Sequence, residues 1–339
     1  MEVKEILGKL VESCDLSYEE SYFMMDKIMK GDIEQSQAAA YLTALRMKGE
    51  TVLEIAASAK AMRDNGTYFS GAEDAIDIVG TGGDKSSSIN ISSISALVVS
   101  AAGVKVTKHG NRAVSSKCGA ADLFEALGVN INLTPEKAKE VFDNTNIIFL
   151  FAQVYHKAMK NAAPIRKALG YRTVFNILGP LTNPAHAEKI VLGSYSKELL
   201  PIIAQVAKEV GIKNALIVNG SDGLDEITLT GKTNMCELRN GIISEFEFDP
   251  RAYGFEYCDK EELMGGDPKE NASIALKILN NEESKRRDAV ILNAGLAIYV
   301  ATDGISIQRG IDIARRTIMS GKALAKLNEF IKETNKIWF

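Results

Sequence analysis

The residues with the clearest chemical potential lie between Asp77 and Arg112. An apolar run ends in Gly80-Thr-Gly-Gly-Asp84, a segment rich in serine and asparagine follows at 88–93, and a second apolar run ends in Lys108-His-Gly-Asn-Arg112. Glycine lets the backbone approach a ligand closely, the N-terminus of a helix offers N–H groups that suit phosphate, and lysine supplies a fixed cation. We interpret this stretch as a site for a small molecule that carries a polyphosphate.

The glycine loop by itself is weak evidence for such a site. The dinucleotide pattern G-x-G-x-x-G fails because Lys85 stands where the third glycine belongs, and the P-loop pattern fails because Asp84 precedes Lys85. For Gly-Thr-Gly-Gly alone, an ordinary turn between a strand and a helix is the better explanation. The polar segment 88–93 and the basic segment that follows the second strand favour the phosphate site.

Two basic residues, Lys108 and Arg112, lie four positions apart around His109. Such residues are usually solvated surface charges, but in a loop at the end of a strand they suit an anion. Arg112 can make the bidentate contact that phosphate accepts. His109 is a candidate proton acceptor, although a lone histidine is more often structural than catalytic.

Asp225 and Glu226 are adjacent carboxylates after Asp222-Gly-Leu. Two interpretations stay open: a charged surface turn, or a magnesium site. Mg²⁺ is usually held by one or two carboxylates while substrate phosphates fill other positions. Opposite the glycine loop, such an ion would neutralise a pyrophosphate.

Arg166 is a further candidate, because it precedes a stretch dense in turn-forming residues, 172–184. Its charge could simply stabilise the C-terminus of a helix. The stretch that follows fits a crossing between two lobes, and boundaries between lobes are favoured places for ligands.

The elements that must position these residues fall into two parts. Residues 1–66 show only helical patterns, with capping boxes at Ser17-x-x-Glu20 and Thr51-x-x-Glu54. After Ala75, short apolar runs alternate with helical stretches, which argues for a mostly parallel sheet covered on both faces. Strands are predicted at 76–79, 104–107, 147–152, 190–194 and 215–218, and helices at 91–102, 120–127, 135–144, 155–169 and 197–210.

The C-terminal third differs from this alternation. Asn240-Gly241 lies between apolar runs at 234–238 and 242–248, a signal for a type I′ hairpin. Helices are predicted at 272–279, 288–301 and within 305–333.

The polar segments follow predicted strands directly, at 80–84, 108–112, 153–156 and 219–226. Ligands of open parallel sheets bind beyond the carboxyl ends of the strands. We therefore expect these loops to meet at one edge of the sheet, which is the strongest argument for a site made from the residues alone.

Composition narrows the class of protein. The 339 residues are 46% hydrophobic and carry a formal net charge of -4 without a block of lysine and arginine, so nucleic acid is a poor default partner. No apolar signal core or membrane-spanning run is present in the sequence. Four scattered cysteines predict reduced thiols in a cytoplasmic protein.

Taken together, the motifs resemble those of the anthranilate phosphoribosyltransferase family, and the resemblance covers nearly the whole chain. The matching segments are 80–84, 90–93, 108–117, 172–184 and 222–226. Five ordered motifs at the family's spacing form a specific signal, although each one alone is common.

The resemblance implies a fold like that of the pyrimidine nucleoside phosphorylases. A small all-helical lobe, residues 1–70 with part of 165–190, would be hinged to a larger α/β lobe, residues 71–339, with a mostly parallel central sheet. The implied reaction transfers the phosphoribosyl group of phosphoribosyl pyrophosphate to anthranilate with Mg²⁺, in tryptophan biosynthesis. The implied assembly is a homodimer that contacts through the helical lobes.

The resemblance also assigns site residues. Magnesium would lie at Ser92, Asp225 and Glu226, and anthranilate at Gly80, Asn111 and Arg166, with Arg166 facing its carboxylate. The residues around phosphoribosyl pyrophosphate would be Gly80, Gly83, Asp84, Ser88, Asn90, Ile91, Ser92, Ser93, Lys108, His109, Gly110, Asn111, Arg112, Ala113, Val114, Ser115, Ser116 and Ala120.

The sequence departs from the family in three places, one of which is the run that begins at Lys85 after the glycine loop. Ala120 lacks a hydroxyl that usually contacts phosphate, and segment 151–161, which lines the acceptor path, departs around Gln153, Tyr155, Lys157 and Asn161. Alternatives are therefore a different aromatic or nitrogenous acceptor, a phosphorylase of the same fold, or a non-catalytic relative that binds nucleic acid. The last would need a basic face, against which the net charge argues.

Overall fold

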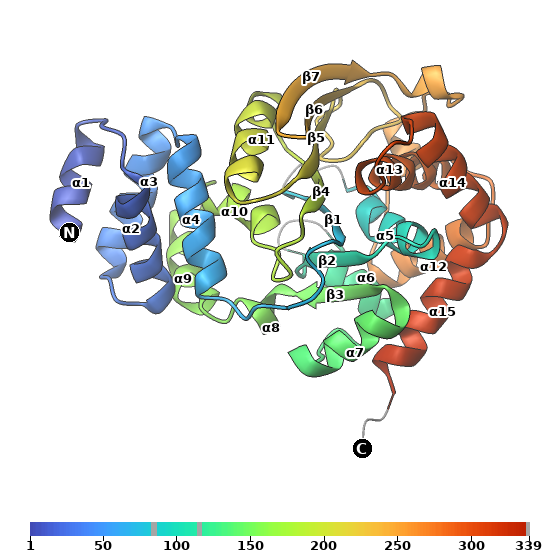
Figure 1. The fold of residues 1–339 in the computed structure, drawn as a ribbon, viewed down its shortest axis with the longest axis horizontal. Helices are drawn as coiled ribbons and strands as arrows, with labels where there is room; N and C mark the ends of the chain where they lie inside the picture. Colours follow the sequence, from blue (N-terminus) through green and yellow to red (C-terminus); the bar gives the residue numbers. More distant parts are fainter. Residues whose placement is uncertain (83–86, 114–116, 337–339) are drawn as a thin grey trace.

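The computed structural model describes residues 1–82, 87–113 and 117–336, and Figure 1 shows a helical lobe beside a larger α/β lobe. Both predicted capping boxes are present, at the starts of α2 and α4. Helix α9, from later in the chain, contacts α2 and α3. The helices of this lobe are α1 (Val3–Val11), α2 (Tyr18–Lys30), α3 (Gln35–Lys48), α4 (Val52–Asp64) and α9 (Met159–Leu169).

A seven-stranded sheet of order β3-β2-β1-β4-β5-β6-β7 forms the α/β lobe. The pairings among the first five strands are parallel, and β6 and β7 continue the sheet antiparallel through the predicted hairpin. Asn240 and Gly241 both have positive φ, as a type I′ turn requires. The strands are β1 (Ile76–Gly80), β2 (Val106–Gly110), β3 (Ile147–Phe151), β4 (Lys189–Gly193), β5 (Asn214–Gly220), β6 (Thr233–Arg239) and β7 (Ile242–Phe248).

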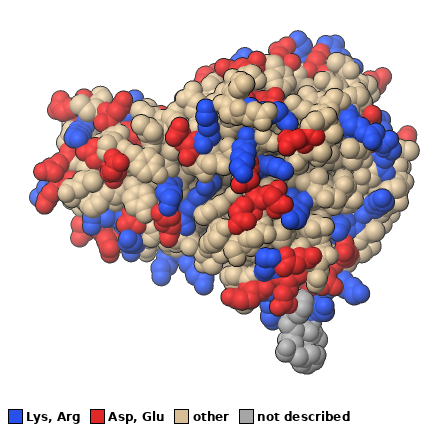
Figure 2. Space-filling model, viewed as in Figure 1, with Lys and Arg blue, Asp and Glu red and all other residues tan. Residues whose placement is uncertain are grey.

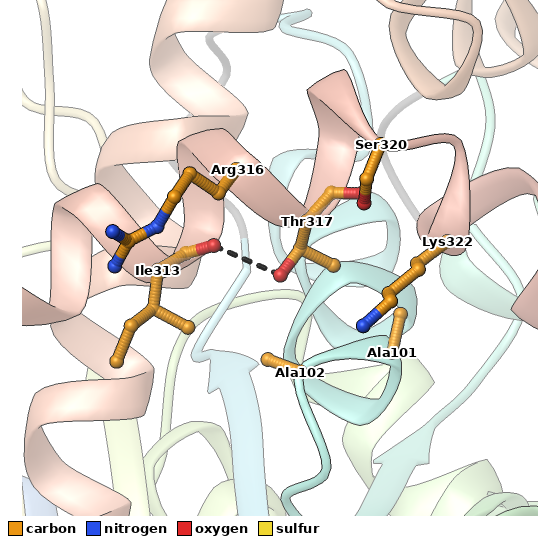
Figure 3. A pocket seen from close by; sticks show the side chains of 7 residues that line it. All are labelled: Ala101, Ala102, Ile313, Arg316, Thr317, Ser320 and Lys322. Atoms are coloured by element: carbon orange, nitrogen blue, oxygen red, sulfur yellow. Dashed lines mark hydrogen bonds between the residues drawn. The ribbon is translucent and has the colours of Figure 1, made fainter.

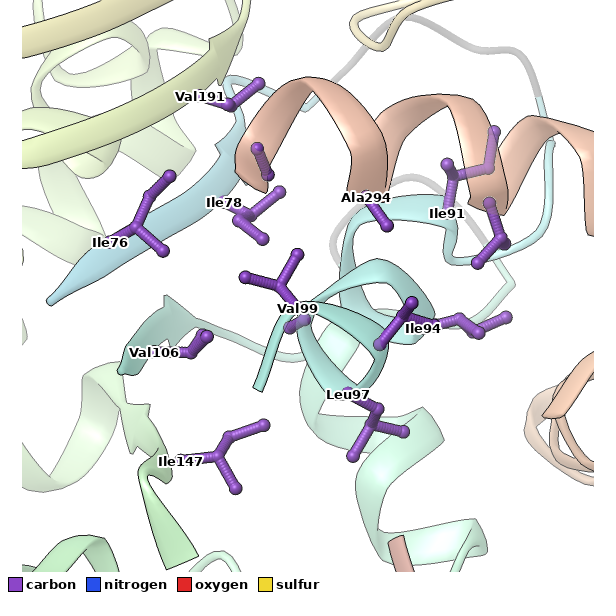
Figure 4. Packing of buried hydrophobic residues seen from close by; sticks show 14 of the residues in the cluster. Ile76, Ile78, Ile91, Ile94, Leu97, Val99, Val106, Ile147, Val191 and Ala294 are labelled. Carbon is purple, nitrogen blue, oxygen red and sulfur yellow. The ribbon is translucent and has the colours of Figure 1, made fainter. Parts of the chain in front are cut away.

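Apolar residues cover both faces of the sheet, as the strand–helix alternation predicts. Ile76 and Ile78 of β1 pack on α5, and Ala294 of α13 closes the same layer (Figure 4). In β4, Val191 joins this layer, whereas its neighbours belong to the second core on the opposite face. Since successive side chains of a strand point to opposite faces, a polar residue between two core residues must face the second layer.

The remaining helices cover the sheet or connect its strands. They are α5 (Ile91–Ala101), α6 (Ala120–Ala126), α7 (Pro135–Thr145), α8 (Ala152–Tyr155), α10 (Phe175–Leu181), α11 (Leu200–Glu209), α12 (Pro268–Leu279), α13 (Lys285–Ala301), α14 (Ile307–Met319) and α15 (Lys322–Thr334), with 3₁₀ turns at Lys197–Leu199, Pro250–Tyr253 and Lys260–Leu263. Within the described residues, every helix is too short or too polar to span a bilayer.

Two predicted boundaries were wrong, and one helix was not predicted. Strand β2 extends to Gly110, so Lys108 and His109 lie within the strand rather than in the loop after it. The helix predicted at 155–169 is divided into α8 and α9 by a break at His156. The turn-rich stretch 172–184 contains α10, because Phe175, Leu178 and Leu181 are buried and packing outweighs the weak helix propensity of Gly179 and Pro180.

Candidate active site

Asp225 packs directly on the ends of two neighbouring strands. Gly80 of β1 and Gly193 of β4 are register partners. A Cβ atom at Gly80 would lie 2.4 Å from the Asp225 carboxylate, and one at Gly193 would lie 1.6 Å from the Asp225 carbonyl oxygen. The backbone N–H of Gly82 donates to Oδ2 of Asp225 at 2.7 Å. The glycine loop and the acidic loop therefore meet at one rim, as predicted.

The first turn of α5 meets the second acidic residue. The Ser92 N–H donates to Oε1 of Glu226 at 3.1 Å. The amides of Ile91 and Ser93 donate to backbone oxygens of Ile89 and Asn90. Chain oxygens thus accept from the amides of the described residues 91–93, and a phosphate would reach these amides only by displacing those contacts.

Lys108 lies beneath this rim. Its side chain is 2% exposed, and Nζ donates to the carbonyl of Ile78 and lies 3.3 Å from Oγ of Ser92. Burial lowers the pKa of Lys108, and the charges of Asp77, Glu226 and Asp225 oppose that shift. The ammonium group is therefore a fixed charge of the sheet rather than a mobile loop cation.

The other predicted residues near α5 have structural contacts. Asn90 donates through Nδ2 to the carbonyl of Cys118 and accepts from Nδ2 of Asn271. The side chain of Ile91 lies in the core, Ser93 is buried, and Ser88 forms a β-bridge with Met264. These contacts anchor the start of α5 under the site.

The donor set fits a magnesium ion. The carboxylates of Asp225 and Glu226 and the hydroxyl of Ser92 are hard oxygen ligands on adjoining elements. The described residues contain no group of three or more His, Cys, Asp or Glu side chains that could hold a metal. A site with only two carboxylates leaves coordination positions for phosphate oxygens and water.

The segment after β2 turns its charge away from this rim. The guanidinium of Arg112 pairs with Asp122 and Glu125 of α6 and lies over the ring of Phe151. The bidentate contact foreseen for a phosphate is made here to a carboxylate, Glu125. Ala113 donates its N–H to Asp122, which fixes the loop to the same helix.

Two further predicted residues pack against each other in this segment. A Cβ atom at Gly110 would lie 3.2 Å from Cβ of Ala120. Five predicted residues lie outside the described part of the chain: Gly83, Asp84, Val114, Ser115 and Ser116.

A cavity of about 240 Å³ lies where the two lobes meet. Gly80, Asn111 and Arg166, the three residues that the resemblance assigns to anthranilate, all line it. Both lobes contribute to its walls, with Met62 and Met159 from the helical lobe. Because Gly80 also touches Asp225, the cavity adjoins the acidic rim.

Arg166 supplies a cation to this cavity. Its guanidinium lies 5.2 Å from the ring centroid of Phe175. Among the described residues, no acidic side chain lies within salt-bridge distance of it. Burial lowers the pKa of Arg166, but an arginine remains charged near neutral pH. A cation without a carboxylate partner in a cavity is suited to an acidic ligand.

Two buried histidines line the same cavity. The ring centroids of His109 and His156 are 5.1 Å apart. Burial lowers the pKa of His156 and lowers the pKa of His109 well below its ordinary value. Nε2 of His156 lies 2.9 Å from the carbonyl of Thr182, whereas Nε2 of His109 has no partner among the described residues. Both imidazoles are therefore neutral near pH 7.

Several residues of the site were missed in the sequence. Gly193 ends a strand as Gly80 does, and that parallel was the available signal for it. His156 stands in a polar segment after a strand, but its pattern does not distinguish it from its neighbours. Thr182 lines the cavity from segment 172–184, which was predicted as a crossing between lobes near a ligand, but Thr182 itself was not singled out.

A second depression lies at the far end of α5, lined by Arg316, Thr317 and Lys322 among others (Figure 3). Helix α5 has 11 residues and so spans about 16 Å, which separates this depression from Ser92. On the face shown in Figure 2, lysine and arginine are interspersed with acidic residues, and no extended basic surface appears.

Two protein-family models match the chain. The glycosyl transferase family, helical bundle domain, matches residues 4–66, and the glycosyl transferase family, a/b domain, matches residues 72–324. These matches agree with the helical and α/β parts of the fold.

Individual relatives are more specific. An anthranilate phosphoribosyltransferase of Methanobrevibacter smithii is 52% identical over 333 residues, 98% of this chain and 99% of that protein. The solved enzyme of Thermus thermophilus is 40% identical with a TM-score of 0.93 over 98% of this chain and 99% of its own. The Saccharomyces cerevisiae enzyme, solved with PRPP and Mg, is 30% identical with a TM-score of 0.89 over 99% and 98%. By this identity over almost its full length, the chain belongs to the anthranilate phosphoribosyltransferase family.

Proposed function

We propose that the chain transfers the phosphoribosyl group of phosphoribosyl pyrophosphate to the amine of anthranilate. The products are N-(5-phosphoribosyl)anthranilate and pyrophosphate, and the reaction serves tryptophan biosynthesis. One observation carries the proposal: an oxygen-rich rim, built by Asp225, Glu226 and Ser92, adjoins a cavity that contains Arg166. The rim suits a charged phosphate donor and the cavity suits an aromatic acid.

The donor half of the site would stabilise a leaving pyrophosphate. Ser92, Asp225 and Glu226 would hold Mg²⁺, which when bound supplies positive charge to the pyrophosphate oxygens. The buried ammonium of Lys108 adds a charge that needs no reorganisation during the reaction, since Ile78 and Ser92 fix its position. The bond from C1 to pyrophosphate then breaks through an oxocarbenium-like transition state, with the electron pair leaving on the pyrophosphate oxygen.

The acceptor half would orient the aromatic amine. Arg166 would face the carboxylate of anthranilate, and Gly80, which packs against Asp225, would form the wall next to the donor, with Asn111 also lining the cavity. The amine attacks C1 from the face opposite pyrophosphate, which inverts the configuration. A protonated aromatic amine gives up its proton more readily than an alkylammonium ion, and the neutral imidazole of His109, although burial lowers its pKa, is the candidate proton acceptor in the cavity.

The four positions at which segment 151–161 departs from the family, Gln153, Tyr155, Lys157 and Asn161, are not among the residues that line the cavity. Gln153 and Lys157 are exposed. Asn161 donates instead to the carbonyl of Met29, at the end of α2. This arrangement favours anthranilate over a different acceptor.

The reaction can be followed through the fluorescence of anthranilate. The signal should fall only when the chain, phosphoribosyl pyrophosphate and Mg²⁺ are all present. Omission of each component in turn is the control. Consumption of phosphoribosyl pyrophosphate with another aromatic amine but not with anthranilate would support the alternative acceptor, and no consumption with either would refute the transferase.

Removal of the rim carboxylates tests the metal assignment. The double variant Asp225→Asn, Glu226→Gln should lose Mg²⁺-dependent turnover by about 10²-fold or more, because the ligands and their charge are gone. Turnover against Mg²⁺ concentration and thermal unfolding are the measurements. The double variant Glu245→Gln, Glu247→Gln removes two carboxylates from the edge strand β7 and should behave as wild type. Wild-type turnover in the rim variant would rule out this metal site.

Removal of Arg166 tests the acceptor assignment. In Arg166→Ala the KM for anthranilate should rise by about tenfold or more, since a charge-assisted hydrogen bond is lost, while the KM for phosphoribosyl pyrophosphate should change less than about twofold. Steady-state kinetics with each substrate varied provides the comparison. Lys167→Ala, at the neighbouring exposed position, is the control. Equal increases in both KM values would make Arg166 a structural residue.

The helical lobe is the proposed dimer surface. Val11 of α1 and Met47 of α3 are 75% and 82% exposed, and these two helices contact each other. Sedimentation velocity should show a species of twice the chain mass, and Met47→Asp should shift it toward the monomer. Met319→Asp, at a similarly exposed methionine of α14, should leave the dimer intact. A wild-type monomer at micromolar concentration would contradict the proposal.

A cytoplasmic location stays a prediction.

A further inference from the structure

Strands β1 and β2 separate just below the site. Within the described residues they share one register pair, Ile76 with Val106, whereas β1 and β4 share five pairs and so do β2 and β3. Backbone groups beyond that pair need other partners, because unsatisfied groups are costly inside a protein. Side chains supply these partners on both strands.

The side chain of Asp77 makes hydrogen bonds where the backbone pairing between β1 and β2 is absent. The side chain is fully buried. Oδ1 accepts from the backbone N–H of His109 at 3.1 Å, and Oδ2 accepts from Nδ2 of Asn183 at 2.8 Å. On the other side of the same gap, Lys108 donates to the carbonyl of Ile78. Because Ile76 and Ile78 face the α5 layer, Asp77 faces the layer that contains the cavity.

Asn183 extends the contact to the crossing segment. Its Nδ2 also donates to the carbonyl of Thr107 at 2.6 Å, and its Oδ1 accepts from Ala185 N–H at 2.8 Å. The preceding residue, Thr182, offers the carbonyl that lies 2.9 Å from Nε2 of His156. One carboxylate thus contacts His109 directly and reaches the partner of His156 through a single intermediate residue.

We propose that Asp77 is a positioning residue for the acceptor side of the site. Its hydrogen bonds to the His109 N–H and to Asn183 hold the backbone at His109 and the Thr182–Asn183 turn in fixed positions. These two segments form two walls of the cavity, and strand pairing does not connect them. The role rests on the proposed function, because the cavity is assigned to anthranilate there. Asp77 itself does not line the cavity, so it touches no substrate.

A carboxylate is required here for a geometric reason. Two N–H donors converge on the side chain, and only a carboxylate offers two acceptor oxygens. Burial raises the pKa of Asp77 to about 6, against the opposing effects of Lys108, Asn183 and the His109 N–H. A carboxyl group whose pKa is raised on folding destabilises the fold when it is ionised, above about pH 6. Asparagine would remove the buried charge, but its NH2 group would face one of the two donors, so one of the two hydrogen bonds would be lost.

The variant Asp77→Asn separates the two roles. At pH of about 8 the loss of a buried charge raises stability and the loss of one accepting oxygen lowers it, so the variant should stay folded, and its Tm measures the balance of the two effects. Its kcat/KM for anthranilate should fall by about tenfold or more, while the Kd for phosphoribosyl pyrophosphate with Mg²⁺ changes less than about threefold. The imidazole NMR signals of His109 and His156 should shift, which reports their position independently of turnover.

Two further variants complete the experiment. Asp77→Asn with Asn183→Asp returns a carboxylate to the pair and should recover part of the lost kcat/KM. Asp288→Asn, which removes a half-buried carboxylate whose pKa burial also raises, is the matched control on α13. Should Asp77→Asn not fold, Asn183→Ser removes the link to the crossing segment and should give the same loss confined to the acceptor.

The outcomes distinguish this proposal from the function on which it rests. A wild-type chain that does not consume anthranilate would refute the function. If wild type is active, normal acceptor kinetics and unshifted histidine signals in Asp77→Asn would overturn the positioning role. Equal losses of donor affinity and acceptor kinetics, or a lowered Tm without the selective loss, would overturn it as well.

Discussion

The site depends on a packing constraint at the ends of β1 and β4. Gly80 and Gly193 leave room for Asp225 to lie directly on the sheet, and any side chain at either position would collide with it. The close contact brings the acidic loop, which follows β5, against the glycine loop, which follows β1. A rim made from segments about 145 residues apart therefore rests on the absence of two Cβ atoms.

Sequence patterns correctly predicted the features that depend on residues close together in the chain. The capping boxes at Ser17 and Thr51 formed as predicted, and so did the hairpin at Asn240. The alternation of apolar runs with helical stretches predicted the parallel sheet. The rule that ligands bind at the carboxyl ends of strands predicted that the loops near Gly80 and Asp225 meet, as they do.

The remaining features depend on contacts between distant segments. Lys108 was expected in a loop, but Ile78 and Ser92 accommodate its ammonium inside the sheet. Arg112 has a suitable type and spacing for phosphate, yet Asp122 and Glu125 occupy its guanidinium. Helix α10 forms where turn residues are dense, because burial of its apolar side chains outweighs propensity. A single sequence does not reveal such partners.

The amides of Gly82 and Ser92 have a consequence for how ligands enter. Each donates to a carboxylate oxygen, from Asp225 and Glu226 respectively. The protein's own carboxylates therefore occupy the N–H donors that an incoming anion would use. An anion would reach these amides by exchange with the carboxylates, and a cation that drew the carboxylates toward itself would favour that exchange. If the cation favours binding of the anion in this way, the anion must favour binding of the cation by the same factor.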